Sequence, residues 1–535
     1  MSAKQKARTK SAPSKSRSYS NLGEHHQTGK TLQSPLKRLD KITSTSWQDD
    51  HLPSVLWAAL LTQALKRTEY LECFRHLAKV SAPWFEDSGP LARKNIPTTD
   101  PTVINFTSVL DFDSLAELPD KEFSEFLTVV RQHTNQPHPL RPLLLLTSLP
   151  SIDRWRGLLG AEPEPNDWEQ LADAVAHCLD HQSEASTDIR WFKLLVPILA
   201  GRMRFGVDLQ DRVKDILEFP NRGDLRSVRP SIRAAEVSMR RNPSPPWVRN
   251  FWDECVGNTG CIDPTDIQAE LKRSPPALDP RNVMSCRMRL IDRFFEVKSS
   301  ERVDARLDTS FGLALYALST LATVLGTRNQ ETMLGRLAIR SIVEARITLA
   351  FLAKKDDLKV WTQWRVYGSG QVKLAFLKTQ EAVGDQPTFY DADDLYQLAN
   401  EDTWQEFLDI DLGHWTKGNL RWMATESGIK DLYDQYYNWS SGFVHAQWGA
   451  VRDTDFVTCH NPLHRLHRIP RAFQRRQASV ERDAADLVNG LIDLVDTLYP
   501  GGVPLDRLKN PLADKPSAAS GEESKDPTPP ANTAA

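Results

Sequence analysis

Residues 335–355 read GRLAIRSIVEARITLAFLAKK, and this stretch decides the fold class. Its apolar residues recur at helical spacing and leave almost no polar face. A helix that is apolar on most sides is buried among other elements. We therefore expect residues 329–354 to form a core helix of a helical bundle.

The chain on both sides of this stretch keeps the same helical spacing and has few alternating β-branched runs. In the C-terminal half, helices are expected over 283–327, 358–383, 391–409, 427–451 and 478–499. In the N-terminal half the folded body begins at Trp47, and helices are expected over 113–132, 166–181 and 186–218. The apolar run at 140–150 fits a buried helix or a strand. The fold class predicted from this pattern is mainly α.

Prolines and arginines mark a boundary between two helical units. Residues 219–280 hold nine prolines and read as an irregular connector with short helices. The predicted organisation is an N-terminal helical domain at 46–218, this Pro/Arg-rich connector, and a C-terminal helical bundle at 281–500. The basic segment 1–45 and the Pro/Ala/Ser/Glu segment 501–535 have too few apolar residues to fold, so both termini are expected to be disordered.

Composition bounds the function. The 535 residues carry a net charge of −3, which gives no global basic field for nucleic acid, and six cysteines, which are too few for a disulfide framework. We expect a cytoplasmic protein. The uncharged stretch 309–327 is expected to be a core helix rather than a membrane span. Walker A, Rossmann, HExxH and GxSxG motifs are absent, and no cofactor is expected.

Two segments of the C-terminal half carry residues suited to chemistry. Arg340 and Glu344 share one face of the buried core helix, and a desolvated ion pair is common at functional sites. Ser441 and His445 lie four residues apart, where a hydroxyl and an imidazole can relay a proton. These four residues are the catalytic candidates. The alternative is that they form structural ion-pair and polar packing networks.

Arginines alternate with aromatic residues in the connector. This pattern suits phosphate contact and base stacking by a single-stranded nucleic acid, but it also fits arginine stems packed on indoles in a domain seam. The candidate binding residues here are Arg226, Arg229, Arg233, Trp247 and Trp252.

The segment CHNPLHRLHRIPRAFQRR at 459–476 is rich in histidine and arginine. His464 and His467 are candidate binding residues in a basic lip that binds phosphate or packs on Glu344; a plain structural loop is the alternative. The segment lacks the paired C-x-x-C of a structural zinc site, so no metal is expected. Cys261 is interpreted as a buried thiol.

At these residues the sequence resembles a bacterial family of unknown function over about 283–499. The shared motifs are R-x3-E at Arg340 and Glu344, a Trp/Tyr-rich segment at 361–368 that includes the binding candidate Arg365, and a Tyr-rich helix ending in S-x3-4-H. The family is loosely similar to the HEPN superfamily of abortive-infection and toxin systems, many of which are RNases with an R-x4–6-H motif. The one such match here, Arg131 to His138, contains a proline that breaks the required helix.

Two functions follow as hypotheses. In the first, the protein is a helical interaction scaffold in a bacterial defence-like system. In the second, the bundle processes RNA or a nucleotide through the cluster of Arg340, Glu344, Ser441 and His445. Whether the protein is an enzyme stays open. The expected partner is RNA, a nucleotide or a protein rather than a membrane, and the oligomeric state is open.

Overall fold

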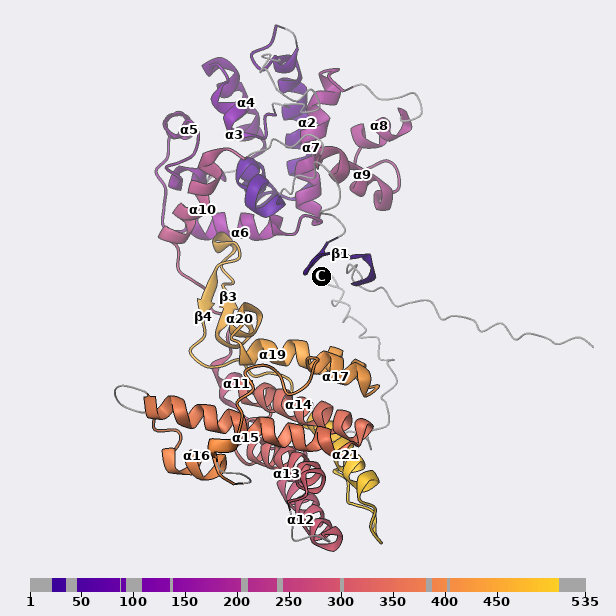
Figure 1. The fold of residues 1–535 in the computed structure, drawn as a ribbon. Coiled ribbons are helices and arrows are strands. Elements are labelled where there is room, and N and C mark those ends of the chain that lie inside the picture. The colour runs from indigo at the N-terminus through magenta and orange to yellow at the C-terminus, as the bar shows by residue number, and fades with distance from the viewer. Residues whose placement is uncertain are drawn as a thin grey trace, which may run out of the picture. The chain divides into compact units, whose positions relative to one another are not determined.

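The computed structural model describes residues 22–34, 46–86, 88–92, 108–134, 138–203, 210–237, 244–298, 303–381, 387–401 and 405–509. These residues are mainly helical, as predicted, with two small antiparallel β ribbons (Figure 1). The chain divides into unit 1, Met1–Ile262 with Cys459–His467, and unit 2, Asp263–Thr458 with Arg468–Ala535. Most of the two predicted disordered tails lies outside the described residues. Within the first tail, β1 (His26–Thr28) and β2 (Thr31–Gln33) form a short hairpin.

Unit 1 is built around an aromatic core. Trp57 is fully buried, and its ring meets Phe126 edge to face with 4.9 Å between ring centroids. Phe74 and Phe192 stack beside it at 5.0 Å. The helices that supply this core are α1 (Leu56–Ala64), α2 (Arg67–Ser81), α3 (Phe112–Ala116), α4 (Asp120–His133), α5 (Ile152–Leu159), α6 (Asp167–Leu179), α7 (Glu184–Leu199), α8 (Gln210–Leu217), α9 (Leu225–Val237) and α10 (Pro246–Asn258).

The Pro- and Arg-rich segment, predicted as an irregular connector with short helices that contains the domain boundary, does contain helices and that boundary, but its first part is built into unit 1. Its first part contains α9 and α10, which pack into unit 1 through buried residues such as Ile232 and Phe251. Pro246 occupies the first turn of α10, where the missing N–H leaves no intrahelical bond unmade. The boundary between the units therefore falls at 262/263, after this segment has already contributed two helices to the core.

A loop far along the chain also belongs to unit 1. The strands β3 (Phe456–Thr458) and β4 (Arg468–Pro470) pair antiparallel in unit 2, with Val457 opposite Ile469. The residues between them form the ribbon-tip loop, Cys459–His467, which is part of unit 1. Its short helical turn η10 (Pro462–His464) packs against α6 and α10, and Leu463 is fully buried in the unit 1 core.

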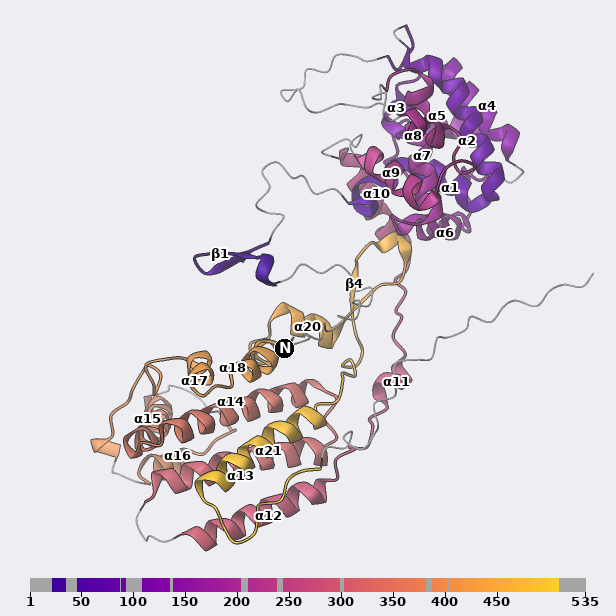
Figure 2. The ribbon, with the colours of Figure 1, turned by 90° about the vertical axis from the view of Figure 1, so that its right-hand side faces the viewer.

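Unit 2 is a helical bundle centred on α14 (Met333–Lys355), which is buried on most sides as the sequence predicts. Figure 2 shows α14 alongside α13 (Ala305–Gly326) and α21 (Glu481–Leu498), while α12 (Pro280–Val297) packs against α13. The single helix expected over 283–327 is therefore two helices. The remaining elements are α11 (Ile267–Leu271), α15 (Leu358–Glu381), α16 (Ala392–Ala399), the short turn η8 (Gln405–Phe407), α17 (Leu420–Glu426), α18 (Lys430–Leu432), the π-helical turn η9 (Tyr433–Tyr437), α19 (Asn438–Val444) and α20 (Trp448–Asp455).

Among the described residues, helix α13 is long and apolar enough to cross a membrane by length and composition. In the bundle it packs against α12, α14, α15 and α21. Its buried residues include Phe311, Leu318 and Leu325, which follow one another at seven-residue intervals on one face. The packing matches the core helix expected from the uncharged stretch.

His138 in unit 1 gives the protein a predicted acid sensitivity. Burial and the nearby positive charge of Arg131 lower the pKa of His138 to about 4 from an ordinary value of 6.5. Its Nδ1 accepts a hydrogen bond from the Leu140 N–H at 3.3 Å, which requires the neutral ring. The unfolded chain binds this proton near pH 6.5 and the folded chain only near pH 4. The stabilising contribution is therefore complete above pH 6.5 and is lost as the pH falls towards 4.

Lowering the pH from 7 to 5 should reduce the free energy of unfolding of unit 1 in both the wild type and His138→Gln. We expect the reduction to be roughly 1–2 kcal/mol larger in the wild type. Urea unfolding read by hydrogen exchange in unit 1 peptides measures this difference. His181→Gln, which replaces an exposed histidine of the same unit, serves as the control and should follow the wild type. Equal losses in the wild type and His138→Gln would contradict the assignment.

Candidate functional site

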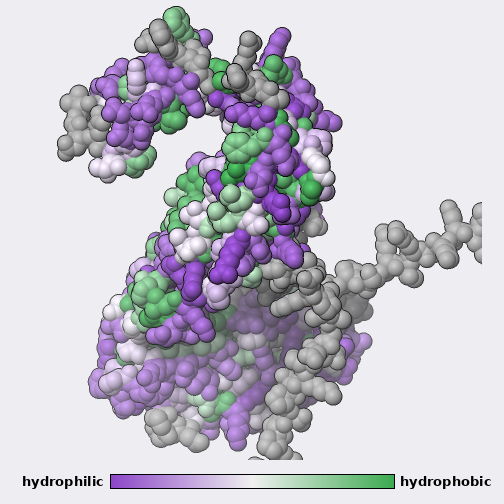
Figure 3. Space-filling view, turned by 90° about the horizontal axis from the view of Figure 1, so that it is seen from below, coloured by the Kyte–Doolittle hydropathy of each residue, from purple (hydrophilic) through white to green (hydrophobic). Residues whose placement is uncertain are grey.

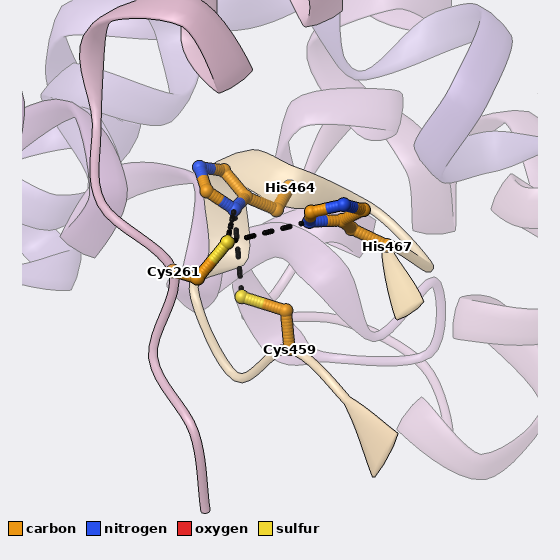
Figure 4. Close-up of side chains that lie close together, drawn as sticks. All are labelled: Cys261, Cys459, His464 and His467. Atoms are coloured by element: carbon orange, nitrogen blue, oxygen red, sulfur yellow. Dashed lines mark hydrogen bonds between the residues drawn. The ribbon is translucent and has the colours of Figure 1, made fainter. Parts of the chain in front are cut away.

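Four side chains with metal-ligating atoms converge within unit 1 (Figure 4). The ligand atoms of Cys261, Cys459, His464 and His467 all lie within 4.8 Å of one another. The Cys261 Sγ is 3.6 Å from Nδ1 of His464 and 3.5 Å from Nδ1 of His467. The Cys459 Sγ is 3.4 Å from Nδ1 of His464. Two thiols and two imidazoles thus face one common point.

Backbone hydrogen bonds of the ribbon-tip loop create this convergence. The Cys459 N–H donates to the His467 carbonyl at 2.9 Å, so the two ends of the loop meet. Pro462 begins η10, and the Asn461 side chain caps that turn by accepting from the Leu463 N–H at 2.9 Å. The segment after α10 comes alongside because the His460 N–H donates to the Ile262 carbonyl at 2.9 Å.

The Thr259 hydroxyl next to the cluster determines which ring nitrogen of His464 carries the proton. Thr259 donates to the Cys255 carbonyl at 2.7 Å, so its oxygen is an acceptor for the His464 Nε2, 2.9 Å away. The proton of the neutral ring therefore lies on Nε2, and the lone pair of Nδ1 points at the two sulfurs. Burial and the neighbouring His467 lower the pKa of His464, which favours this neutral form.

The structure differs from what the sequence led us to expect at this cluster. His464 and His467 are not free to form a basic lip, because their Nδ1 atoms lie against the thiols. Cys261 is exposed rather than buried. The available signal was the spacing C-x4-H-x2-H from Cys459 to His467, but Cys261 lies 203 positions before His464. Pro462 begins the turn η10, which presents His464.

The second candidate cluster lies on α14 in unit 2. Arg340 is 7% exposed and forms an ion pair with Glu344 one helical turn further on. The guanidinium carbon lies 3.7 Å from the centre of the Tyr437 ring, and Tyr437 stacks on Tyr433 with 4.4 Å between centroids. The predicted pairing of Arg340 with Glu344 is therefore present, and a tyrosine covers the cation.

His445 does not pair with either residue. The residues of η9 form a π-helical turn, which contains about one more residue than an α-helical turn. Residues spaced four apart across this turn therefore do not lie on the same face of the helix. α19 then ends at Val444, and Ala446 adopts a left-handed φ of 46°. The His445 side chain is exposed, and within the described ranges it has no hydrogen bond, ion pair or ring contact. Ser441 likewise shows no side-chain hydrogen bond among those residues.

A family model covers this part of the chain. Residues 335–462 match a family of unknown function, DUF5677. The chain carries a DUF5677 domain. The match is narrower than the resemblance over 283–499; it includes Arg340, His445 and Cys459 and stops before His464 and His467. Neither curated proteins nor solved structures match the chain, and nothing found supports a link to HEPN proteins.

Within the DUF5677 domain, the binding candidate Arg365 has a structural partner. Its Nη1 lies 2.5 Å from Oδ2 of Asp308, so the guanidinium ties α15 to α13. Trp361, one turn earlier, is fully buried. The Trp/Tyr-rich motif noted in the sequence therefore contributes packing between helices at these two positions.

The arginines and tryptophans of α9 and α10 are also engaged within unit 1. Trp247 and Trp252 are 9% and 3% exposed, which leaves little ring surface on which a base could stack. Arg229 pairs with Glu184, and Arg233 donates to the Thr187 hydroxyl at 3.2 Å. Arg226 is exposed. Arg229 and Arg233 therefore meet polar partners on α7, and the two indoles are buried within unit 1.

Proposed function

We propose that this protein is a cytoplasmic interaction scaffold whose DUF5677 domain binds a protein partner. The observation that carries the proposal is an exposed apolar surface formed by α19 and α20, here called the tryptophan surface: Trp439, Val444 and Trp448. These side chains are 54%, 49% and 63% exposed. Exposed tryptophans are uncommon on soluble proteins and are strongly enriched among the residues that dominate binding energy at protein interfaces.

The rings of the tryptophan surface are held in place, which lowers the entropy lost on binding. Trp439 meets Phe443 edge to face with 5.3 Å between centroids, and Trp448 lies 5.8 Å from Phe456. Across the helix junction, a Cβ built on Gly449 would lie 3.4 Å from the Trp439 ring, so the ring rests directly on α20. On the face drawn in Figure 3, hydrophobic residues form small patches among hydrophilic ones.

Local charge favours a protein over a nucleic acid. Residues 430–458, which contain the tryptophan surface, carry two basic and four acidic side chains. A strand of nucleic acid needs cationic side chains along its phosphates, and a segment with a net charge of −2 repels them. A defence role stays a prediction from the motif resemblance.

The second candidate, an RNA- or nucleotide-processing enzyme, rests on Arg340. Its buried guanidinium keeps an Nε without a hydrogen-bond partner among the described residues, although Glu344 and Tyr437 contact the same group. An anionic ligand could accept from that donor. The second candidate also uses His445, whose side chain is exposed.

Photo-crosslinking distinguishes the two candidates. A photoreactive phenylalanine analogue at position 448 should give a discrete protein adduct in cells, and the same analogue at Phe295, 67% exposed on α12, should not. The purified partner should then bind Trp439→Ala and Trp448→Ala about tenfold or more weakly than the wild type. An adduct with RNA would favour the second candidate, and equal labelling at both positions would contradict the tryptophan surface.

A further inference from the structure

We propose that Cys261, Cys459, His464 and His467 bind one Zn²⁺ ion in a structural site within unit 1. The proposal is independent of the tryptophan surface. It rests on the distances between the four ligand atoms, on the hydrogen bonds around them, and on where these residues lie along the chain.

The distances match a tetrahedral zinc site. Zinc–sulfur bonds of about 2.3 Å and zinc–nitrogen bonds of about 2.0–2.1 Å place neighbouring ligand atoms roughly 3.3–3.8 Å apart. Three of the four sulfur–nitrogen separations are 3.4, 3.5 and 3.6 Å, and no pair of ligand atoms exceeds 4.8 Å. The set therefore needs only small adjustments to enclose one ion.

The kind of ligand selects the metal. Two thiolates with two imidazoles are the donors of structural zinc sites, whereas calcium and magnesium prefer oxygen. All four positions of a tetrahedron are taken by protein side chains, so no position remains for a water or a substrate. A closed set of this kind stabilises a fold and does not activate a ligand.

Hydrogen bonds around the cluster orient the ligands. The His464 ring donates from Nε2 to Thr259, which leaves Nδ1 as the ligand atom and is the outer-shell contact typical of a metal-bound histidine. The Cys459 Sγ accepts from two backbone N–H groups, Ile262 at 3.3 Å and Asn461 at 3.4 Å. Backbone donors of this kind are outer-shell contacts that orient a metal-binding side chain.

The position of the ligands along the chain indicates what the ion does. Cys261 is the penultimate residue of unit 1 before the chain enters unit 2, and Cys459 and His467 are the first and last residues of the ribbon-tip loop. One ion would therefore join the three points at which the chain passes between the units, all on the unit 1 side. It would close a loop of about 200 residues, and its binding energy would add to the folding energy of unit 1.

Metal analysis of the full chain tests the site. Protein purified without chelator should contain about one Zn²⁺ per chain. Cys261→Ser and His467→Ala should bind zinc at least about tenfold more weakly. The matched controls are His460→Ala, an exposed histidine of the same loop, and Cys286→Ala, a cysteine of unit 2; both should keep full zinc content.

Hydrogen exchange supplies a readout that does not depend on metal content. Removing zinc with a chelator should increase exchange in the ribbon-tip loop and in residues 259–262, and added Zn²⁺ should restore protection. Co²⁺ in place of zinc should show sulfur-to-metal charge-transfer absorption that Cys261→Ser weakens. Failure of the chain to take up zinc, equal zinc affinity in Cys261→Ser and the wild type, or a Cys261–Cys459 disulfide in protein alkylated at lysis would each overturn the proposal.

Discussion

Replacing Asp188 with alanine is expected to lower the free energy of unfolding of unit 1 by about 3–5 kcal/mol. Asp188 lies on α7 with no exposed surface, and it accepts from Arg67 at 2.8 and 3.1 Å and from the Tyr70 hydroxyl at 2.7 Å. Burial and the neighbouring carboxylate raise the pKa of Tyr70, so the phenol remains a donor. Without Asp188, the Tyr70 hydroxyl on α2 loses its acceptor, and the Arg67 guanidinium keeps only the partly exposed Glu184 among its two carboxylate partners on α7.

Two milder variants test this explanation. Asp188→Asn keeps an acceptor for Tyr70 but removes the charge, so it should cost less than the alanine variant. Glu184→Gln removes the partly exposed carboxylate that also pairs with Arg67, at 2.7 Å, and should cost under about 1 kcal/mol. Urea unfolding read by hydrogen exchange in α2 and α7 measures all three. A loss below about 1 kcal/mol for Asp188→Ala would show that the carboxylate is dispensable.

In unit 2, Trp361→Ala is expected to cost about 3–5 kcal/mol. Trp361 is fully buried near the start of α15, and its Nε1 donates to Asp356 at 3.3 Å. Asp356 follows the last residue of α14 with a left-handed φ of 39° and accepts two hydrogen bonds from Arg306, at 2.6 and 3.1 Å. The indole therefore fills the corner where α13, α14 and α15 meet, and alanine leaves a cavity there.

Trp361→Phe should lose about 1–2 kcal/mol, because it keeps most of the buried ring and removes the hydrogen bond. Trp448→Ala, which truncates a tryptophan 63% exposed in the same unit, should change stability by less than about 0.5 kcal/mol. Thermal unfolding followed by limited proteolysis of unit 2 measures these differences. Equal losses in Trp361→Ala and Trp448→Ala would contradict the buried role of Trp361.

The helical fold class follows from local patterns in the sequence. The apolar run at 335–355 predicts a buried helix because its residues leave no polar face at helical spacing, and α14 is that helix. The pairing of Arg340 with Glu344 was also predictable from the sequence, because residues four apart are neighbours on the same face of a helix.

Local patterns fail where the backbone departs from regular helix. The expected helix over 427–451 contains a π turn and a break at Ala446, so His445 leaves the face on which its spacing placed it. The tryptophans at 247 and 252 resembled a stacking surface, but burial depends on which helices pack over them, and α10 packs into unit 1.

By itself, the sequence determined that this protein is mainly α-helical and which long helix lies in the core, because helical periodicity is a property of neighbouring residues. Only the tertiary structure decided which chemical groups meet. Cys261 and the ribbon-tip loop lie about 200 residues apart, and their meeting depends on a chain that leaves unit 1, builds most of unit 2 and returns. A spacing motif cannot encode that return, because long-range backbone hydrogen bonds and the burial of Leu463 in the unit 1 core produce it.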